Sequence, residues 1–407
     1  MNYASRRTRL GELMDDFSTL VLFSSNSSTG GHHFDVDRSF YYFTGLEQAD
    51  MILQLTKVHG KVNETLFIQP FDPVQARWVG GRISAEEATK ISGVKNVRDY
   101  RDFNAAIAGM HEMTRSYETF TLYLDYSKTN EAHNGTPTHR LARKIVNNYP
   151  TWNIKDSFRL TTSLRMIKDE EEVAEIRKAN EITAQGVVAM MKAIGDGKRE
   201  MEIDGTFALE IRKQGCAEHA FPTIAASGMN ATILHYGENK DLCHDGELFL
   251  TDLGATSNHY CADVSRTFPV NGVFTERQKQ LYQTVLDVQK LVEANAKPGL
   301  STNDLNQIVI DYYEKVLPEL GLTKGVREYY FHGVSHLLGL DCHDCTIEHG
   351  RIPLQPGMVI SNEPGLYITD EATGIRIEDD LLITEDGCVN LTTTPKEIAE
   401  IEAIMKK

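Results

Sequence analysis

Short apolar runs alternate with helical patterns along the first part of the chain. Apolar positions repeat with helical spacing over Asp102–Arg115 and over Arg140–Asn147. Four short apolar runs have the character of strands, namely Leu20–Phe23, Met51–Leu55, Thr65–Ile68 and Thr119–Leu124. Strands that alternate with helices are typical of layered folds, so we predict an α/β domain over residues 1–160.

The pattern changes near residue 160, and a clear helix start follows. Asp169 has the position of a helix N-cap, and Glu172 three residues later is the reciprocal acid of a capping box. The predicted helix covers Glu170–Ala193 and stops near Gly195. Further helices are expected over Met201–Gln214, Glu276–Ala296 and Thr302–Leu317.

Stretches with strand character lie between these helices. They are Leu248–Leu253, Tyr260–Phe268, Met358–Glu363 and Arg376–Thr384. We therefore predict that residues 161–407 form an α+β domain in which helices flank a mostly antiparallel sheet.

Acidic residues outnumber basic ones, with 58 Asp and Glu against 42 Lys and Arg and a net charge of −16. Such a surface repels a phosphate backbone and an anionic lipid surface, so we expect neither nucleic acid nor a membrane as a partner. The first residues lack the apolar core of a signal peptide, and no apolar run approaches the ~18 residues of a membrane helix. Six cysteines in 407 residues fit reduced thiols, so we expect a cytoplasmic location.

The sequence lacks the short signatures of several enzyme classes. It has no G-x-G-x-x-G after a strand, no P-loop, no G-x-S-x-G and no H-E-x-x-H. Cys342 and Cys345 form a C-x-x-C pair, but a structural zinc site needs a second such pair, so a zinc or redox role is the minor interpretation. What remains is a group of acids and histidines on short predicted strands.

Two of these acids fall on one predicted hairpin. Asp252 lies near the end of an apolar strand, and Asp263 lies on the next one. A turn at Ser257 and Asn258 would place the two acids directly opposite each other, with Cβ atoms about 4.5–5.5 Å apart. Carboxylates this close repel each other unless a proton or a cation lies between them.

The same arrangement recurs later, where a hairpin centred at Asp370 and Glu371 would place Glu363 opposite Glu378. Two acid pairs are what two cations about 3.5–4 Å apart require. Each acid alone has an ordinary explanation as a turn, cap or solvated residue, but an unpaired acid at the inward end of an apolar run is costly. Nitrogen ligands or proton carriers could come from His332, His336, His343 and His235.

Together these residues resemble the pita-bread metallopeptidase family and, within it, the aminopeptidase P (Xaa-Pro aminopeptidase) group. The resemblance covers essentially the whole chain, and the expected residue types fill all five ligand positions, Asp252, Asp263, His336, Glu363 and Glu378. Phe40–Gly45 and Trp78–Arg82 match stretches of the N-terminal domain of that group. The resemblance implies a pita-bread fold and a dinuclear, metal-dependent aminopeptidase that hydrolyses Xaa-Pro bonds.

The resemblance also implies a role for each ligand. Asp263 and Glu378 would bridge two divalent cations, and the hydroxide that the cations share would attack the scissile carbonyl. Asp252 would complete one cation site, and His336 and Glu363 the other. Glu363 would also carry the proton to the proline nitrogen. The oxygen-rich set favours Mn, with Zn, Co or Fe as alternatives.

Further residues are implied to contact the substrate. His235 and His343 would hydrogen-bond the developing oxyanion or the substrate backbone. His332, Tyr367 and Arg376 are candidates for lining the proline pocket and orienting the two glutamates, with structural support as the alternative.

Two other functions stay open. Prolidases, which cut Xaa-Pro dipeptides, share both domains and the ligands, but residues 333–336 read Gly-x-Ser-His as in aminopeptidase P, whereas prolidases more often have Gly-x-Gly-His. A non-catalytic pita-bread binding module is disfavoured because such proteins have lost several ligands. The expected partners are peptides with a penultimate proline and further copies of the chain in a homodimer or homotetramer, because Trp78 resembles a residue that reaches a neighbouring subunit's site.

Overall fold

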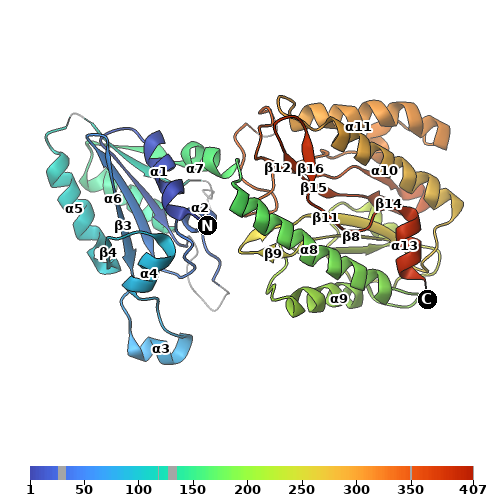
Figure 1. The fold of residues 1–407 in the computed structure, drawn as a ribbon, viewed down its shortest axis with the longest axis horizontal. Helices are drawn as coiled ribbons and strands as arrows, with labels where there is room; N and C mark the ends of the chain where they lie inside the picture. Colours follow the sequence, from blue (N-terminus) through green and yellow to red (C-terminus); the bar gives the residue numbers. More distant parts are fainter. Residues whose placement is uncertain (26–33, 118, 127–134, 349–350, 407) are drawn as a thin grey trace. The chain divides into compact units, whose positions relative to one another are not determined.

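The computed structural model describes residues 1–25, 34–117, 119–126, 135–348 and 351–406. The chain divides into two compact units, Met1–Arg165 and Met166–Lys407, both drawn in Figure 1. Among the described residues, no helix is both long enough and apolar enough to cross a membrane.

A mixed six-stranded sheet forms the centre of the N-terminal unit. Its strands in spatial order are β4 (Val97–Asp99), β3 (Lys61–Ile68), β2 (Ile52–Val58), β1 (Ser18–Phe23), β5 (Phe120–Leu124) and β6 (Trp152–Asp156). Strand β1 pairs antiparallel with β2 and parallel with β5, and all its residues are buried. A strand that is buried on both faces needs a continuous apolar run, and such a run is why the sequence predicts this strand.

Helices accompany this sheet, as the alternation of patterns predicts. They are α1 (Tyr3–Leu13), α2 (Arg38–Thr44), α3 (Pro73–Val79), α4 (Ala85–Ser92), η1 (Tyr100–Asp102), α5 (Phe103–Thr114), α6 (Pro137–Asn148) and α7 (Phe158–Arg165). Ile107 of α5 and Ile145 of α6 join the same buried apolar cluster as Leu122 of β5. Helix α3 lies apart from the sheet of this unit (Figure 1), and its Trp78 is 84% exposed.

Strands β7–β16 and the longer helices make up the C-terminal unit. The strands are β7 (Ile224–Ser227), β8 (Leu248–Leu253), β9 (Thr256–Ser257), β10 (Tyr260–Cys261), β11 (Val264–Pro269), β12 (Val359–Asn362), β13 (Gly365–Ile368), β14 (Thr373–Arg376), β15 (Asp379–Ile383) and β16 (Cys388–Asn390). The helices are α8 (Glu170–Ala193), α9 (Glu200–Lys213), α10 (Glu276–Asn295), α11 (Thr302–Val316), α12 (Val326–Tyr329) and α13 (Ile398–Met405), with short turns η3 (Gly228–Thr232), η4 (Leu317–Leu320) and η5 (Thr369–Glu371).

Every ladder between described strands of this unit is antiparallel, as the sequence predicts. Helix α8 has the predicted bounds because its start is set locally. The side chain of Asp169 accepts from the Glu172 amide at 2.9 Å, and the Glu172 side chain accepts from the Asp169 amide at 3.0 Å. The α+β prediction for this part of the chain is therefore confirmed.

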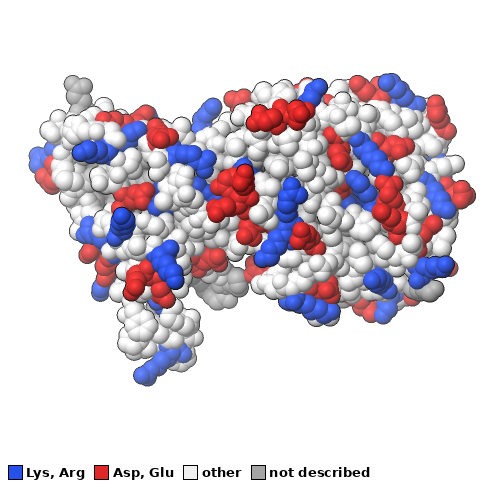
Figure 2. Space-filling model, viewed as in Figure 1, with Lys and Arg blue, Asp and Glu red and all other residues white. Residues whose placement is uncertain are grey.

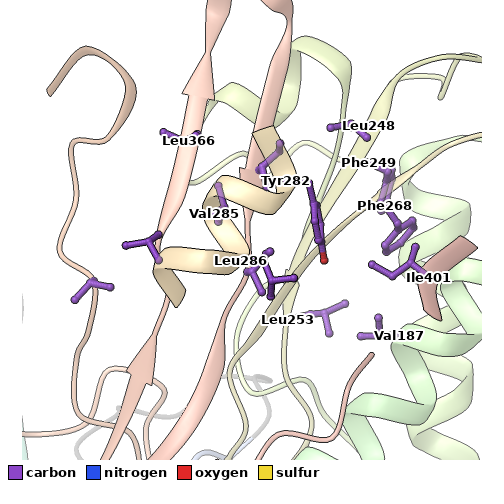
Figure 3. Close-up of a cluster of buried hydrophobic side chains, with 14 of the residues drawn as sticks. Val187, Leu248, Phe249, Leu253, Phe268, Tyr282, Val285, Leu286, Leu366 and Ile401 are labelled. Carbon is purple, nitrogen blue, oxygen red and sulfur yellow. The ribbon is translucent and has the colours of Figure 1, made fainter. Parts of the chain in front are cut away.

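Apolar side chains from α10 and from strands β8 and β11 share one buried core (Figure 3). Tyr282 and Leu286 of α10 are in the same cluster as Phe249 of β8 and Phe268 of β11. The rings of the two phenylalanines lie 5.5 Å apart. This core fixes the two strands that carry the first pair of acids.

Two strand predictions are wrong in a way that bears on function. The expected strand Tyr260–Phe268 is interrupted after Cys261, and the expected strand Arg376–Thr384 is interrupted after Arg376. Each interruption contains one of the candidate acids. Apolar residues recur on both sides of each break, which is why the sequence pattern predicts one strand through each.

The predicted pairing of Asp252 with Asp263 is also wrong. Strand β8 pairs with β11 so that Asp252 lies opposite Ser265. The turn lies one residue later than expected, because Asn258 and His259 both adopt positive φ values, of 46° and 65°, as a two-residue hairpin turn requires. A turn displaced by one residue shifts every facing pair by two, which leaves both acids on the same face.

Candidate metal centre

One cavity of about 580 Å³ in the C-terminal unit is lined by nine of the predicted site residues, whereas Tyr367, also a candidate for lining the proline pocket, is not among the lining residues. The nine are His235, Asp252, Asp263, His332, His336, His343, Glu363, Arg376 and Glu378. They come from separate strands and loops between residues 235 and 378, so the fold brings together residues that are far apart in the chain.

Three of the four acids lie where strands are interrupted. Asp263 lies between β10 and β11, Glu363 between β12 and β13, and Glu378 between β14 and β15. The ladders on either side pair Asn362 with Asp379 and Gly365 with Arg376, so the common register places Glu363 across from Glu378 as the sequence predicts. The interruptions free these side chains from the regular alternation of a strand.

A glycine allows the first pair of acids to approach each other. A Cβ atom on Gly254 would lie 1.8 Å from the carbonyl oxygen of Ala262. The backbone just after Asp252 therefore contacts the backbone just before Asp263, and any larger residue at position 254 would force them apart.

His336 lies among the acids. Its Nε2 is 3.3 Å from Asp263 Oδ2 and 3.5 Å from Glu363 Oε1. One ligand atom each from Asp263, His336 and Glu378 all lie within 4.8 Å of one another. The Ser361 hydroxyl accepts from the His336 amide at 3.0 Å, which ties the histidine to β12.

The acids are buried together, and their pKa values reflect it. Burial, with the charge of Asp263 adding to it, raises the pKa of Asp252 to about 6 and that of Glu363 to about 7. Burial and the neighbouring carboxylates raise the pKa of Glu378 well above its usual range. Burial also acts on Asp263, but the hydrogen bond and charge of His336 outweigh it and lower the pKa of Asp263. His336 in turn has a pKa raised to about 9, because Asp263 and Glu363 outweigh its burial.

Arg376 is a buried cation beside these acids. Its Nη2 donates to Asp252 Oδ2 at 2.7 Å, and its Nε donates to the Ser265 hydroxyl at 2.7 Å. That hydroxyl donates to Glu378 Oε2 at 2.7 Å. The other oxygen of Asp252, Oδ1, is buried, and no donor among the described residues reaches it. Clustered carboxylates with one imidazole and an orphaned buried oxygen form a donor set that fits divalent cations.

The remaining histidines surround this cluster. His332 Nε2 lies 2.9 Å from the Tyr367 hydroxyl, whose oxygen accepts from Arg376 Nη1 at 2.9 Å. Burial, helped by the charge of Arg376, lowers the pKa of His332 to about 4, so its ring is neutral. Its Nδ1 donates to the Gly333 carbonyl at 2.8 Å, so Nε2 accepts the hydrogen bond of the tyrosine hydroxyl. The His343 ring stacks on the His336 ring with centroids 4.0 Å apart.

A buried carboxylate holds the loop that carries His235. Oε1 of Glu200, the fully buried first residue of α9, accepts from the amide and hydroxyl of Ser227 at 2.8 and 2.9 Å. Its Oε2 accepts from the Tyr236 hydroxyl at 2.8 Å and from the Asp241 amide at 3.0 Å. One side chain thereby fixes the loop at both ends and next to His235.

Sequence reasoning missed several residues of the site. Ser265 carries a detectable signal, because it lies two residues after Asp263 and so on the same strand face. The apolar wall of the cavity has no such signal, because its residues precede β7, begin it or lie in the His235 loop. The wall consists of Phe221, Pro222, Ile224, Leu234 and Tyr236.

An antiparallel unit around a cavity of clustered carboxylates and histidines defines a metal-dependent hydrolase as the class of protein. The family model of metallopeptidase family M24 matches residues 174–385, and that of the aminopeptidase P N-terminal domain matches residues 3–120. The chain belongs to metallopeptidase family M24, with the N-terminal domain of aminopeptidase P.

Named relatives match along nearly the whole chain. The Xaa-Pro aminopeptidase of Haemophilus influenzae is 33% identical, over 99% of this chain and 96% of its own length. The Xaa-Pro aminopeptidase of Escherichia coli is 31% identical, over 99% and 97%. Among solved structures, Zn-substituted Escherichia coli aminopeptidase P in complex with product matches with a TM-score of 0.89 and 30% identity, over 99% of this chain and 97% of that one.

Proposed function

We propose that the protein releases the N-terminal residue from peptides that have proline in the second position. The observation that carries this proposal is the convergence of Asp252, Asp263, His336, Glu363 and Glu378 on one cavity, in a chain similar over its whole length to Xaa-Pro aminopeptidases. The family membership supports metal dependence and peptide-bond hydrolysis.

These five residues would hold two divalent cations. The pKa values of Asp252, Glu363 and Glu378 are raised although Arg376 lies beside Asp252, which supports bound cations as the further positive charge that these buried acids need to ionise together. Oxygen ligands dominate, so Mn is the preferred ion, with Zn, Co or Fe as alternatives. When bound, such cations polarise a peptide carbonyl and acidify water.

Glu363 is the proposed proton carrier. Its carboxylate lines the cavity 3.5 Å from His336 Nε2, and in the metal-free site burial raises its pKa, so the group can hold a proton there. The nitrogen of a scissile Xaa-Pro bond carries no hydrogen, so it must receive a proton before it can leave. Glu363 would take the proton of the attacking water and deliver it to that nitrogen.

His235 and His343 would bind the substrate from the cavity wall, by donating to the developing oxyanion or to the peptide backbone. His332, Tyr367 and Arg376 form a chain of hydrogen bonds that ends on Asp252. This chain would orient the acids and, with the apolar wall, accommodate a proline ring.

The test supplies the chelator-treated protein with Mn, Zn, Co or Fe and compares an Xaa-Pro dipeptide with a longer Xaa-Pro-Xaa peptide. We expect metal to restore release of the first residue from the longer peptide. Cleavage of the dipeptide alone would identify a prolidase instead. No cleavage and no bound metal under any supply would indicate a non-catalytic binding module.

We also propose that the protein assembles into a homodimer or homotetramer through α3. The helix and Phe71, two residues before it, expose apolar side chains, namely Phe71, Val74, Trp78 and Val79. Clustered exposed apolar side chains are typical of interaction sites. Light scattering of the protein and of a Trp78→Ser variant tests this, and an unchanged monomeric mass in both would exclude it.

A cytoplasmic location is likewise proposed, supported by six free cysteines.

A further inference from the structure

A cysteine enters the cavity beside the acids, and the proposed peptidase chemistry does not use it. Cys342 lines the cavity, and its Sγ lies 2.8 Å from Asp263 Oδ2, to which it donates. Cys345, three residues later, is not among the residues that line the cavity. The two cysteines of the C-x-x-C pair therefore have different surroundings.

Cys342 also belongs to a second set of metal-ligand atoms. Ligand atoms of His336, Cys342 and His343 lie within 4.8 Å of one another. A thiolate with two imidazoles is typical of sites for zinc and other thiophilic cations, whereas carboxylates suit harder ions such as Mn. His336 belongs to both sets, so the cavity offers a hard set and a softer set that share one histidine.

The loop that presents Cys342 and His343 is anchored in the interior. Lys168 Nζ lies 3.2 Å from Asp344 Oδ2, and both side chains are 1% exposed. The Asp344 amide also donates to the Leu337 carbonyl at 2.9 Å, which closes the loop between them. The loop that carries the thiol and His343 is thus anchored before a cation arrives, and only the stacked His336 and His343 rings have to turn for their nitrogens to face one ion.

We propose that His336, Cys342 and His343 bind a thiophilic divalent cation, Zn²⁺ or Cd²⁺. Binding forms a metal–sulfur bond, the thiol proton passes to solvent, and no electrons are transferred. The inference deepens the proposed function, because His343 is a proposed substrate contact. An ion held by His336, Cys342 and His343 takes His336 away from the hard set and His343 away from the substrate, so thiophilic cations compete with Mn²⁺ and inhibit a peptidase that Mn²⁺ activates.

The test titrates the full-length, Mn-loaded protein with Cd²⁺ and follows the ultraviolet charge-transfer absorption of a Cd–thiolate bond. We expect the band in the wild type and in Cys345→Ser, the matched control, and no band in Cys342→Ser. We also expect His343→Gln, which keeps the thiol, to weaken the Cd²⁺ affinity by about tenfold or more, since even indirect metal contacts contribute that much.

Each other outcome contradicts a defined part of the account. A wild type that cleaves the Xaa-Pro-Xaa peptide with Mn²⁺ but shows no band overturns the soft-cation site alone. A band that persists in Cys342→Ser, or an unchanged affinity in His343→Gln, overturns the assigned ligands. A band in a protein that cleaves no peptide at any Mn²⁺ supply contradicts the proposed function and leaves the cation site standing.

Discussion

The N-terminal unit and the cavity of the C-terminal unit differ in the arrangement of their buried charges. In the N-terminal unit the buried Arg7 is matched, because it donates to the carbonyls of Phe43 and Ser92 and pairs with Glu64 at 3.0 Å. In the cavity of the C-terminal unit the buried acids oppose one another, and the pKa values of Glu363 and Glu378 rise. Matched charges belong to the architecture, whereas opposed charges mark the place where a positively charged ligand is needed.

The same contrast appears in the strands. Strand β1 pairs without interruption with β2 from Ser18 to Phe23, and β2 pairs with β3 in the same way. In the C-terminal unit the candidate acids Glu363 and Glu378 occupy the gap between two ladders of one register. Continuous pairing stabilises the fold, and the gaps present side chains to the cavity.

The largest expected effect is that of Glu363→Gln. If Glu363 carries the proton, kcat for an Xaa-Pro-Xaa peptide should fall about 10²–10⁴-fold. Folding stability in chelator should be kept or raised, because the amide does not have to ionise in a buried site. Glu385→Gln, the same change at an exposed position, should leave both unchanged. Wild-type turnover in Glu363→Gln would remove the residue from the mechanism.

Leu122→Ala, in the N-terminal unit, should lower folding stability and leave turnover unchanged, which is the opposite of the effect expected for Glu363→Gln. Leu122 is fully buried on β5, so its truncation should lower the free energy of unfolding by about 2–5 kcal/mol. Val146→Ala on α6, where the side chain is 63% exposed, should change it by less than about 0.5 kcal/mol. Denaturant titration checks both, and kcat per folded molecule should stay at the wild-type value.

Asp379, a buried acid that pairs with two basic side chains, should make the free energy of unfolding depend on pH. Burial acts to raise the pKa of Asp379, but Arg266 and Lys396 outweigh it and lower that pKa to about 2. The stabilisation is present above the usual pKa and is lost as pH falls from about 4 to about 2, which amounts to about 2 kcal/mol. Asp379→Asn should be less stable at neutral pH but should lose less stability over that range, measured in chelator. Equal losses would show that Asp379 does not titrate as described.

The smallest effect is expected at Glu200, which acts through a loop. Glu200→Gln should lower kcat/KM by about tenfold, because one amide cannot accept all the hydrogen bonds that hold the His235 loop. In a His235→Ala background the same change should cost less than about twofold. Equal effects in both backgrounds would mean that Glu200 supports the fold and not His235.

Local signals made much of the architecture predictable. The capping box of Asp169 and Glu172 and the continuous apolar runs of β1 and β8 depend on neighbouring residues alone. The interruption at Glu378 does not, because its amide donates to the Ser265 carbonyl at 3.1 Å across two hairpins. Such a contact exists only after both hairpins have formed.

The site was predictable in residue type but not in detail. The turn at Asn258 and His259 shifts the strand register by two residues from the predicted one. Because side chains alternate between faces with a period of two, Asp252 and Asp263 still lie on one face of the hairpin. Cavity walls such as Phe221 and the thiol of Cys342 meet the acids only through long-range packing. Local sequence patterns do not predict such long-range contacts.

The most direct test of the central claim is a count of bound metal. The protein, purified with Mn²⁺ in the buffer and freed of excess ion, is measured for Mn per chain together with Asp263→Asn. We predict about two ions per wild-type chain, as two acid pairs require, and fewer in the variant. A wild type that holds no divalent ion at any supply would contradict the account.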